Sequence, residues 1–454
     1  MQHIQVDVLV LGGGTAGSNA ARAAARAGAQ RVVMVHPDTL TNTCVEEGCM
    51  PSKSILAGAH QKESLGEVEE TRNAHIDRLL TALTIGFEME TFEVVLGTAA
   101  FVDNQTVTLT TSEETTTYTA NKIIIATGSL PFIPPIPGLD TLGSSLLVSD
   151  DVVSKKAHFS EVPKRVLTIG GGPIGLELST FFHDMGTHVE VLQRDAALSA
   201  FDPEFGAERV RASQDPESFP IHLQANLLQA KKTEAGVVCE IDRDGTVTTE
   251  TFDYVLIATG RRPNTTALNL EATDVDLDER GNIMHDDCMQ TTAENIYVAG
   301  DVTGHHQILH FAAEMGKVAG HNAGTTDDPI TMDYDKHMLA VSFDQFPSAL
   351  IGLTETEARK RGMNVVTATR QFNSIGLGIL KRQEYGLWKV VAEAETGKII
   401  GSQILGPDSS GELIQLLVPV LANKNTATDI LNMTWYHPTY AEVLKSLARE
   451  IVGT

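Results

Sequence analysis

Two cysteines lie five positions apart in the segment Cys44-Val-Glu-Glu-Gly-Cys49-Met-Pro-Ser-Lys53. In an ideal helix their Cα atoms would be about 8 to 9 Å apart, which exceeds the ~7 Å that a disulfide allows. The turn between them must therefore be distorted, and Gly48 permits that distortion. Pro51 suits the start of a regular helix just beyond, and a helix N-terminus stabilises thiolate. The segment predicts a redox-active pair in which Cys49 is the more acidic and reactive thiol.

Two other interpretations of this segment are open. The cysteines could be unlinked residues that pack as small apolar side chains. A zinc site has less support, because no second Cys or His pair lies at matching spacing, and we expect no metal site. Cys239 and Cys288 have no partner in the sequence and are expected to be structural.

Glycine-rich turns follow two apolar strand patterns. The first turn is Gly12-Gly-Gly14-Thr-Ala-Gly17 after residues 6–11, and the second is Gly170-Gly-Gly172-Pro-Ile-Gly175 after residues 165–169. Each turn precedes a helical stretch and a second strand. Such a turn lets the backbone approach a pyrophosphate at the positive end of the helix. One motif could reflect tight helix–strand packing alone, but two correctly placed motifs predict two dinucleotide-binding sites.

The domain organisation follows from this repeat. Each unit is later followed by an apolar strand ending in Ala-Thr-Gly, at residues 126–128 and 258–260. Past Tyr334, strand patterns over residues 348–353, 386–392 and 399–405 alternate with helical patterns over residues 410–422 and 439–451, and no further nucleotide loop occurs. We therefore expect three domains. Their bounds are 1–149 with a central segment 266–333 for the first nucleotide-binding domain, 150–265 for the second, and 334–454 for an α+β domain.

The composition limits the partners. The 454 residues include 34 Lys and Arg against 59 Asp and Glu, a net charge of −25, without long single-sign blocks. Nucleic acid and acidic membrane surfaces are therefore poor partners. The apolar runs fall short of the ~18 residues that span a bilayer, and a strand pattern begins almost at Met1. We expect no membrane span, no leader and a cytoplasmic location.

The motifs resemble those of the class I flavin disulfide reductases, the family of dihydrolipoamide dehydrogenase, glutathione reductase and mercuric reductase. The resemblance covers essentially the whole chain. The matching segments are Gly12/Gly14/Gly17, Cys44/Cys49 with Lys53, Ala126-Thr-Gly128, Gly170/Gly172/Gly175 with Glu177, Ala258-Thr-Gly-Arg-Arg-Pro-Asn264, Thr292-Ala-Glu-Asn-Ile-Tyr-Val-Ala-Gly-Asp301 and His437-Pro-Thr-Tyr-Ala-Glu442. The resemblance implies an α/β fold with two Rossmann-like dinucleotide-binding domains and a C-terminal α+β dimerisation domain.

The resemblance also implies the cofactors and the redox centre. FAD would bind the first domain and NAD(P)H the second. Cys49 would face the isoalloxazine, while Cys44 would meet a disulfide or lipoyl-type substrate. Lys53 would lie near the flavin and pair with Glu177. A flavin can accept hydride on one face and deliver electrons to sulfur on the other, so these roles agree with the chemistry.

The resemblance assigns His437 the role of the acid/base that manages the thiol protons. Glu442 would orient it, and the other subunit of a homodimer would supply it. Histidine suits this role because its pKa lies near the working pH. Alternatively, Thr439-Tyr-Ala-Glu442 has capping-box spacing, so Glu442 could cap the helix that follows. The two uses could coexist.

Further cofactor contacts are carried over from the resemblance. Asp301 would bind the ribityl chain of FAD. The other FAD contacts would come from Gly12, Gly14, Gly17, His36, Thr43, Lys53, Thr127 and Gly128. The NAD(P)H contacts would come from Gly170, Gly172, Gly175, Arg194 and Gly260. The chain departs from the family pattern at His36 and Gln193, where an acid normally binds ribose, and at Asn42-Thr43, where Gly-Gly is usual.

The end of the second strand of the second unit bears on nicotinamide specificity. Gln193 is neutral and Arg194 follows it, so a 2′-phosphate would meet a cation. This pattern favours NADPH, with NADH used less well. Arg194 could instead be a solvated residue paired with Asp195, and Asp195 could even serve as the missing carboxylate, which would favour NADH.

Within the family, the closest type is dihydrolipoamide dehydrogenase. Such enzymes usually carry another His two residues before the catalytic one, where this chain has Trp435. Alternatives are an NADPH-dependent reductase of another disulfide or of a metal ion, of the glutathione or mercuric reductase type. The sequence ends without the extra cysteine pair expected of a mercuric reductase. A non-catalytic flavoprotein is disfavoured, because a structural role needs neither the cysteine pair nor His437.

Overall fold

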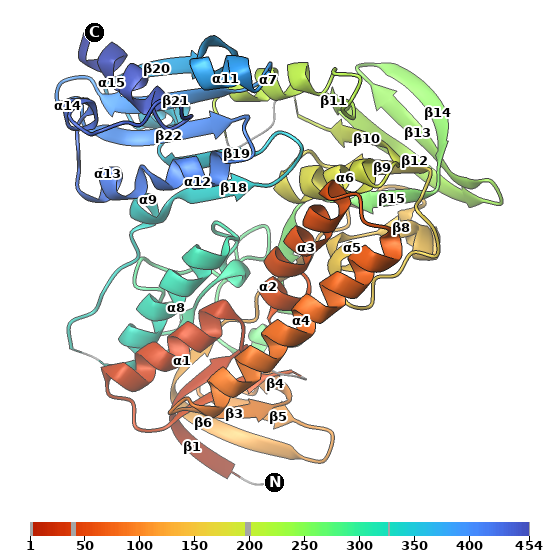
Figure 1. The fold of residues 1–454 in the computed structure, drawn as a ribbon. Helices are drawn as coiled ribbons and strands as arrows, with labels where there is room; N and C mark the ends of the chain where they lie inside the picture. The colour runs from red at the N-terminus through yellow and green to blue at the C-terminus, as the bar shows by residue number, and fades with distance from the viewer. Residues whose placement is uncertain (1–2, 38–41, 196–200, 326, 454) are drawn as a thin grey trace.

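The computed structural model describes residues 3–37, 42–195, 201–325 and 327–453. Figure 1 shows two α/β units and, beside them, a C-terminal unit of strands and helices. Within these described ranges, no helix is both long and apolar enough to cross a membrane. The architecture confirms the predicted fold class.

The first nucleotide-binding domain is built on a mixed sheet with the strand order β3-β2-β1-β6-β5-β4, and β17 also pairs with β6. The pairings β1–β2, β2–β3, β1–β6 and β6–β17 are parallel. The strands are β1 (His3–Leu11), β2 (Val32–His36), β3 (Glu93–Leu96), β4 (Thr98–Phe101), β5 (Thr106–Thr110), β6 (Thr115–Ile125) and β17 (Ile296–Val298). Because β1, β6 and β17 are parallel neighbours, the segments that follow them meet at one edge of the sheet.

Two helices pack closely in this domain, α1 (Thr15–Ala27) and α8 (Leu309–Gly324). A Cβ atom added at Gly316 would lie 2.2 Å from the Ala16 carbonyl oxygen, and one at Gly320 would lie 2.1 Å from the Ala20 oxygen. Glycine is therefore required along α8 for the two backbones to approach this closely. The contact joins the central segment to the N-terminal part of the domain (Figure 1).

The second nucleotide-binding domain has a parallel sheet with the order β11-β10-β9-β15-β8, covered by the antiparallel layer β12-β13-β14. Its sheet begins at β8, slightly before the expected boundary at residue 150. The strands are β8 (Leu146–Leu147), β9 (Arg165–Ile169), β10 (His188–Gln193), β11 (Ile221–Leu223), β12 (Ala225–Thr233), β13 (Gly236–Arg243), β14 (Thr246–Phe252) and β15 (Tyr254–Ile257). A two-stranded ribbon of β7 (Ser129–Pro131) and β16 (Arg261–Pro263) links this domain to the first.

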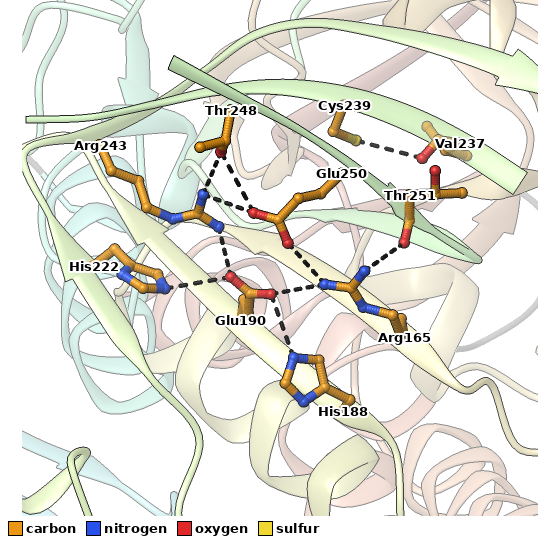
Figure 2. A network of polar contacts seen from close by, with 10 residues as sticks. All are labelled: Arg165, His188, Glu190, His222, Val237, Cys239, Arg243, Thr248, Glu250 and Thr251. Atoms are coloured by element: carbon orange, nitrogen blue, oxygen red, sulfur yellow. Dashed lines mark hydrogen bonds and ion pairs between the residues drawn. The ribbon is translucent and has the colours of Figure 1, made fainter. Parts of the chain in front are cut away.

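A polar network fixes the β12–β14 layer on the parallel sheet (Figure 2). Buried Glu190 forms ion pairs with Arg165 at 3.0 Å and Arg243 at 2.6 Å. Nitrogen atoms of His188 and His222 each lie 3.3 Å from the same carboxylate. Burial alone would raise the pKa of Glu190, but His222 and Arg243 outweigh it and lower this pKa to about 2. The carboxylate is therefore charged and cross-links two layers of the domain.

The C-terminal domain has an antiparallel sheet with the order β18-β19-β22-β21-β20. This confirms the α+β prediction. The strands are β18 (Leu339–Ser342), β19 (Ser348–Gly352), β20 (Val365–Gln371), β21 (Leu387–Glu393) and β22 (Ile399–Leu405). Trp388 is fully buried under the helices, with its indole N–H donated to Ser402 Oγ at 2.9 Å.

The helices of this domain depart from the sequence expectation in two places. The expected single helix over residues 410–422 is split into α12 (Ser410–Gln415) and α13 (Val418–Ala422), because Pro419 cannot continue a helical hydrogen-bond ladder. The last helix, expected from residue 439, begins at Val443. The helices are α9 (Tyr334–His337), α10 (Glu355–Lys360), α11 (Gly376–Leu380), α14 (Ala427–Leu431) and α15 (Val443–Gly453).

The sequence motifs did not indicate the long helix α4 (Leu65–Glu88), which begins with a capping box between Ser64 and Glu67. In Figure 1 it crosses the molecule diagonally beside α3. The remaining helices are α2 (Thr43–Glu46), α3 (Cys49–His60), α5 (Ser149–Val153), α6 (Pro173–Asp184) and α7 (Pro203–Ala212).

Candidate active site

The two cysteines lie on two short helices that meet at Gly48. Cys44 is in α2, where Val45 N–H donates to the Asn42 side chain at 3.0 Å, and Cys49 is the first residue of α3. A Cβ atom at Gly48 would lie 2.7 Å from the Thr43 carbonyl oxygen, so only glycine fits the tight turn. α3 begins two residues before the expected start at Pro51. Cys49 therefore occupies the helix N-terminus itself.

The two thiols differ in acidity, as predicted. Both are unlinked here; Cys44 is half-buried and Cys49 is exposed. A hydrogen bond from the Cys44 thiol lowers the pKa of Cys49 to about 7, against the effect of burial and with help from the Lys53 charge. The same hydrogen bond, together with burial, raises the pKa of Cys44. Cys49 is thus the thiolate of the pair and Cys44 its hydrogen-bond donor.

Lys53 is held beside the cysteines by residues from two other domains. Its ammonium lies 2.6 Å from Oε2 of Glu177, a buried residue of α6. The other oxygen of Glu177 accepts the Phe343 N–H at 3.0 Å, and the Lys53 nitrogen lies 4.9 Å from the Phe343 ring centroid. The expected ion pair is present. It connects the redox segment to the second nucleotide-binding domain and, through Phe343, to the C-terminal domain.

The first glycine-rich turn leaves room for a ligand at one of its three key glycines. Gly12 has φ +112°, and a Cβ there would lie 2.3 Å from the Ala126 carbonyl oxygen. A Cβ at Gly17 would lie 1.8 Å from the Gly12 oxygen, whereas one at Gly14 would meet nothing within 4 Å. Gly12 and Gly17 are therefore needed for packing, and Gly14 faces open space at the start of α1, where a pyrophosphate would bind.

Other residues expected to bind FAD gather at the same edge of the first sheet. Thr127 follows β6, and its buried hydroxyl oxygen makes no hydrogen bond among the described residues. Asp301 follows β17; its carboxylate accepts the Ser129 hydroxyl at 2.9 Å, and burial raises its pKa. His36 ends β2 and lies against the turn, since a Cβ at Gly13 would be 2.4 Å from its ring. The open glycine, the unpaired hydroxyl and the polar carboxylate fit a dinucleotide at this edge.

Thr43 and Gly128 complete the expected FAD contacts. Thr43 is exposed at the start of α2, and Gly128 has φ +72° just after Thr127. Asn264 supports this turn, with its backbone N–H donated to the Gly128 oxygen at 3.0 Å. Gly128 therefore lies at the edge where Asp301 and Thr127 meet, and Thr43 lies on the short helix that carries Cys44.

A cleft of about 530 Å³ opens at the second glycine-rich turn. Gly170 and Gly175 repeat the close backbone contacts of the first turn, while a Cβ at Gly172 or at Gly260 would meet nothing within 4 Å. The cleft is lined by Gly170, Gly172, Gln193, Arg194, Asp195, Thr259 and Gly260 together with the apolar residues Phe132, Ile174 and Leu227. The cleft therefore lies where the nicotinamide nucleotide was expected.

The polar residues at the end of β10 contact one another in this cleft. The Gln193 side-chain oxygen accepts the Gly171 N–H at 2.9 Å, and its amide donates to Asp195 at 3.2 Å. Arg194 lies 3.6 Å from Asp195, and its side chain is 81% exposed. The pairing of Arg194 with Asp195, left open by the sequence, is thus present in the structure, and both side chains face the cleft.

His437 and Glu442 form a pair in the loop between α14 and α15. The His437 Nδ1 atom lies 2.9 Å from Glu442 Oε2 and, since a carboxylate only accepts, it must carry the proton. The His437 side chain is 73% exposed, which leaves its other ring nitrogen accessible. The Thr439 N–H donates to Glu442 at 3.4 Å, but α15 begins only at Val443, so the spacing does not form a capping box. In Figure 1 this loop lies at the far end of the C-terminal domain, away from α2 and α3.

Three contributors to the site were given no role from the sequence. Ser129 and Arg261 follow the two Ala-Thr-Gly segments, and Arg261 Nε donates to the Ser129 hydroxyl at 2.7 Å, behind Asp301. Their symmetric positions in the repeat were a signal that could have revealed them. Phe343 stands in no motif, and the sequence held no sign of its contact with Lys53.

One acidic cluster has metal-like spacing. Among the His, Cys, Asp and Glu residues in the described part of the chain, only Asp202, Glu204 and Glu355 bring three ligand atoms within 4.8 Å of one another. The Lys389 ammonium lies 2.9, 2.5 and 2.7 Å from these three residues. The Lys389 ammonium therefore occupies the position that a metal ion would take, and the cluster joins the start of α7 to the C-terminal domain.

Comparison with known proteins agrees with this architecture. Residues 6–316 match the pyridine nucleotide-disulphide oxidoreductase family, and residues 338–448 match the dimerisation domain of the same family. The chain is 32% identical over 469 residues to the dihydrolipoyl dehydrogenase of Geobacillus stearothermophilus, covering 99% of this chain and 97% of that protein. It is 29% identical over 462 residues to the mercuric reductase of Staphylococcus aureus, covering 97% of this chain and 82% of that protein.

A solved structure has the same fold. The copper(II) complex of the HOCl-induced flavoprotein disulfide reductase RclA from Escherichia coli superposes with a TM-score of 0.86 at 24% identity, covering 98% of this chain and 99% of that one. The match over residues 6–316 and the dimerisation domain over residues 338–448 define a class of pyridine nucleotide-linked oxidoreductases. The chain belongs to the pyridine nucleotide-disulphide oxidoreductase family and is an FAD-dependent disulfide oxidoreductase.

Proposed function

We propose that Cys44 and Cys49 carry two electrons between NAD(P)H and a disulfide substrate of the dihydrolipoamide type. The observation that carries this proposal is the acidity difference between the thiols, which prepares Cys49 as thiolate and Cys44 as thiol. FAD, held at the edge that contains Gly14, Thr127 and Asp301, would supply the hydride acceptor. Glu177 holds the Lys53 ammonium in place near Cys49, and this positive charge stabilises the Cys49 thiolate.

The thiols would exchange with the substrate in two balanced steps. The Cys44 sulfur gives up its proton and attacks the substrate disulfide, which forms a mixed disulfide and releases one substrate thiol. The Cys49 thiolate then attacks the Cys44 sulfur, which forms the Cys44–Cys49 disulfide and releases the second substrate sulfur. The substrate gains two electrons and two protons, one proton from Cys44 and one from solvent. The hydride of NAD(P)H then restores the Cys44 thiol and the Cys49 thiolate.

His437 of the partner subunit would accept and return these protons. In one chain its loop lies away from α2, and its ring is exposed beside Glu442. The C-terminal domain also exposes the large side chains of Leu380 and Tyr436, at 73% and 81%, which a homodimer interface would cover. Mixed dimers test this sharing. Inactive Cys44→Ser chains combined with inactive His437→Ala chains should recover partial activity, and a mixture shown to have exchanged subunits without recovery would contradict it.

The substrate class is tested by turnover of lipoamide, glutathione disulfide and Hg²⁺ at matched enzyme concentration. We expect the highest kcat/KM with the lipoyl substrate. The second candidate, a metal-ion reductase, is favoured only by the likeness to mercuric reductases. Trp435 occupies the position where the lipoyl enzymes usually have His, and its indole N–H donates to the Ile430 oxygen at 3.0 Å. Turnover of Hg²⁺ alone would move the proposal to that second class.

We further propose that NADPH is preferred over NADH. The Arg194 side chain faces the cleft and is exposed, so it can leave Asp195 for a 2′-phosphate. Steady-state kinetics with both nucleotides test this on wild type, on Arg194→Ala and on the control Arg262→Ala. NADPH should lose kcat/KM selectively in Arg194→Ala. A wild type that prefers NADH, unchanged by this substitution, would overturn the preference.

A further inference from the structure

Several histidines gather beside α9, outside the cofactor and thiol sites. His285 precedes β17 in sequence, whereas His305 and His306 lie between Asp301 and α8. The ring centroids of His285 and His305 are 5.3 Å apart, and those of His305 and Tyr334 are 5.5 Å apart. His305 therefore lies between a second imidazole and a phenol.

The hydrogen bonding of His285 leaves one ring nitrogen as a bare acceptor. Its Nδ1 atom lies 2.8 Å from the Asp286 carbonyl oxygen, which can only accept, so Nδ1 must carry a proton. In the neutral ring, Nε2 then presents a lone pair. This Nε2 atom is buried and makes no hydrogen bond among the described residues. A backbone carbonyl that fixes the far nitrogen is the arrangement typical of metal-ligating histidines.

Tyr334 supplies a second buried atom without a partner. Its hydroxyl oxygen is buried and makes no hydrogen bond within the described ranges. Burial raises the pKa of Tyr334 to about 12, so the group is a neutral phenol with free acceptor lone pairs. Two unpaired polar atoms, one on each side of His305, are unfavourable unless a ligand or water satisfies them.

The charges around this cluster favour a cation. The rings of His285 and His305 lie against each other, and the neutral imidazole is the form that binds metal ions. The negative charge of Asp278 acts on His305 and that of Asp287 acts on Tyr334, so carboxylates contribute to the electrostatic potential at both rings. Neutral imidazoles with carboxylates around them attract a divalent ion.

We propose that His285 and His305 bind a late first-row divalent ion such as Zn²⁺ or Cu²⁺, with the Tyr334 hydroxyl or water completing the coordination. Imidazole is a preferred ligand of these ions. In the rotamers that the structure shows, no three His, Cys, Asp or Glu side chains of this described cluster bring ligand atoms within 4.8 Å of one another. The site is thus a two-histidine site, and the exposed His305 ring turns about χ2 to direct a nitrogen at the ion.

The test uses the FAD-loaded full chain carrying Cys44→Ser and Cys49→Ser, so that the redox thiols cannot bind metal. Cu²⁺ is added at one equivalent, and its EPR spectrum is recorded. We expect one bound ion with nitrogen superhyperfine structure from two imidazoles, and displacement of that ion by Zn²⁺. His285→Gln and His305→Gln should each weaken Cu²⁺ binding by at least about tenfold.

His321→Gln is the matched control, because this histidine lies on α8 and its Nε2 is 3.1 Å from the Asp328 oxygen. It should bind Cu²⁺ as the parent does. His305 is at the surface, so His305→Gln reports on binding even if His285→Gln impairs folding, and retained flavin absorbance verifies the fold. The proposal is overturned if no ion binds at one equivalent, if the spectrum lacks two-imidazole coupling, or if His305→Gln binds Cu²⁺ like the control.

Discussion

The acidity of Cys49 can be measured separately from that of the other cysteines through the pH dependence of its alkylation. With the ordinary thiol pKa of 9.0, about 1% of Cys49 would be thiolate at pH 7, whereas the pKa of about 7 makes about half of it thiolate. The intrinsic nucleophilicity of a thiolate falls as its pKa falls, and a Brønsted slope of about 0.45 makes the Cys49 thiolate roughly eightfold less reactive, which offsets part of the larger thiolate fraction. The net rate at pH 7 should therefore rise only about sixfold, so the midpoint of the pH profile is the decisive quantity.

Two substitutions of Cys44 test whether its hydrogen bond is the cause of the lowered pKa of Cys49. Cys44→Ala removes the hydrogen bond that lowers the pKa of Cys49 most, so the midpoint should rise by about one unit or more. Cys44→Ser keeps an O–H donor at the same position, and its midpoint should stay near that of wild type. The assay is anaerobic iodoacetamide labelling of the reduced protein between pH 5 and 10, quantified by mass spectrometry of each cysteine peptide.

The other two cysteines are internal references in the same digest. Burial raises the pKa of Cys239 to about 12, and burial with nearby aspartates raises that of Cys288, so both should label only at alkaline pH. The reasoning is refuted if the Cys44→Ala profile superimposes on that of wild type, or if Cys44 labels at lower pH than Cys49.

Three further outcomes follow from the structure. Gly14→Ala should fold but retain less FAD per chain, while Gly172→Ala should retain FAD and raise the KM for the nicotinamide nucleotide, because each added Cβ enters only open space at one turn. Flavin absorbance measures the FAD content, and steady-state kinetics measure the KM. Equal FAD loss in the two variants would count against the assignment. Glu190→Gln should destabilise the protein by about 3 kcal/mol above pH 4.5. The difference in unfolding free energy from wild type, measured from denaturant midpoints, should shrink as the pH falls toward 2, because the wild-type carboxylate is itself protonated there. A difference that does not change with pH would contradict this account. Glu442→Gln should lower kcat by about tenfold or more with little change in nucleotide KM, since the carboxylate fixes the His437 tautomer, and an unchanged kcat would remove that role.

Local motifs made much of the fold predictable. β9 and β22 have the bounds expected from the sequence, because each is a short apolar run that ends in a turn. The region between the two nucleotide motifs was harder. β5 (Thr106–Thr110) buries only alternate residues of a threonine-rich segment, and α4 buries few of its residues, so neither carries a strong apolar pattern.

The site was predictable where chemistry and spacing coincide, and less so where distant segments meet. Pro51 suggested a helix start at that residue, but the first residues of a helix have no intrahelical N–H bond to lose, so proline fits the third position and α3 begins at Cys49. The Lys53–Glu177 pair came from the resemblance. The contact of Phe343 with Glu177 joins residues 166 positions apart and depends on how the domains pack, which no local pattern encodes.

The most direct test of the central claim is a thiol count before and after reduction by the nicotinamide nucleotide. The oxidised FAD-loaded protein is alkylated under denaturing conditions, and a second sample is first treated anaerobically with one equivalent of NADPH. We predict that Cys44 and Cys49 are protected in the first sample and both labelled in the second, while Cys239 and Cys288 label equally in both. If Cys44 and Cys49 are labelled without NADPH, or remain protected after it, the proposed electron path through this pair is contradicted.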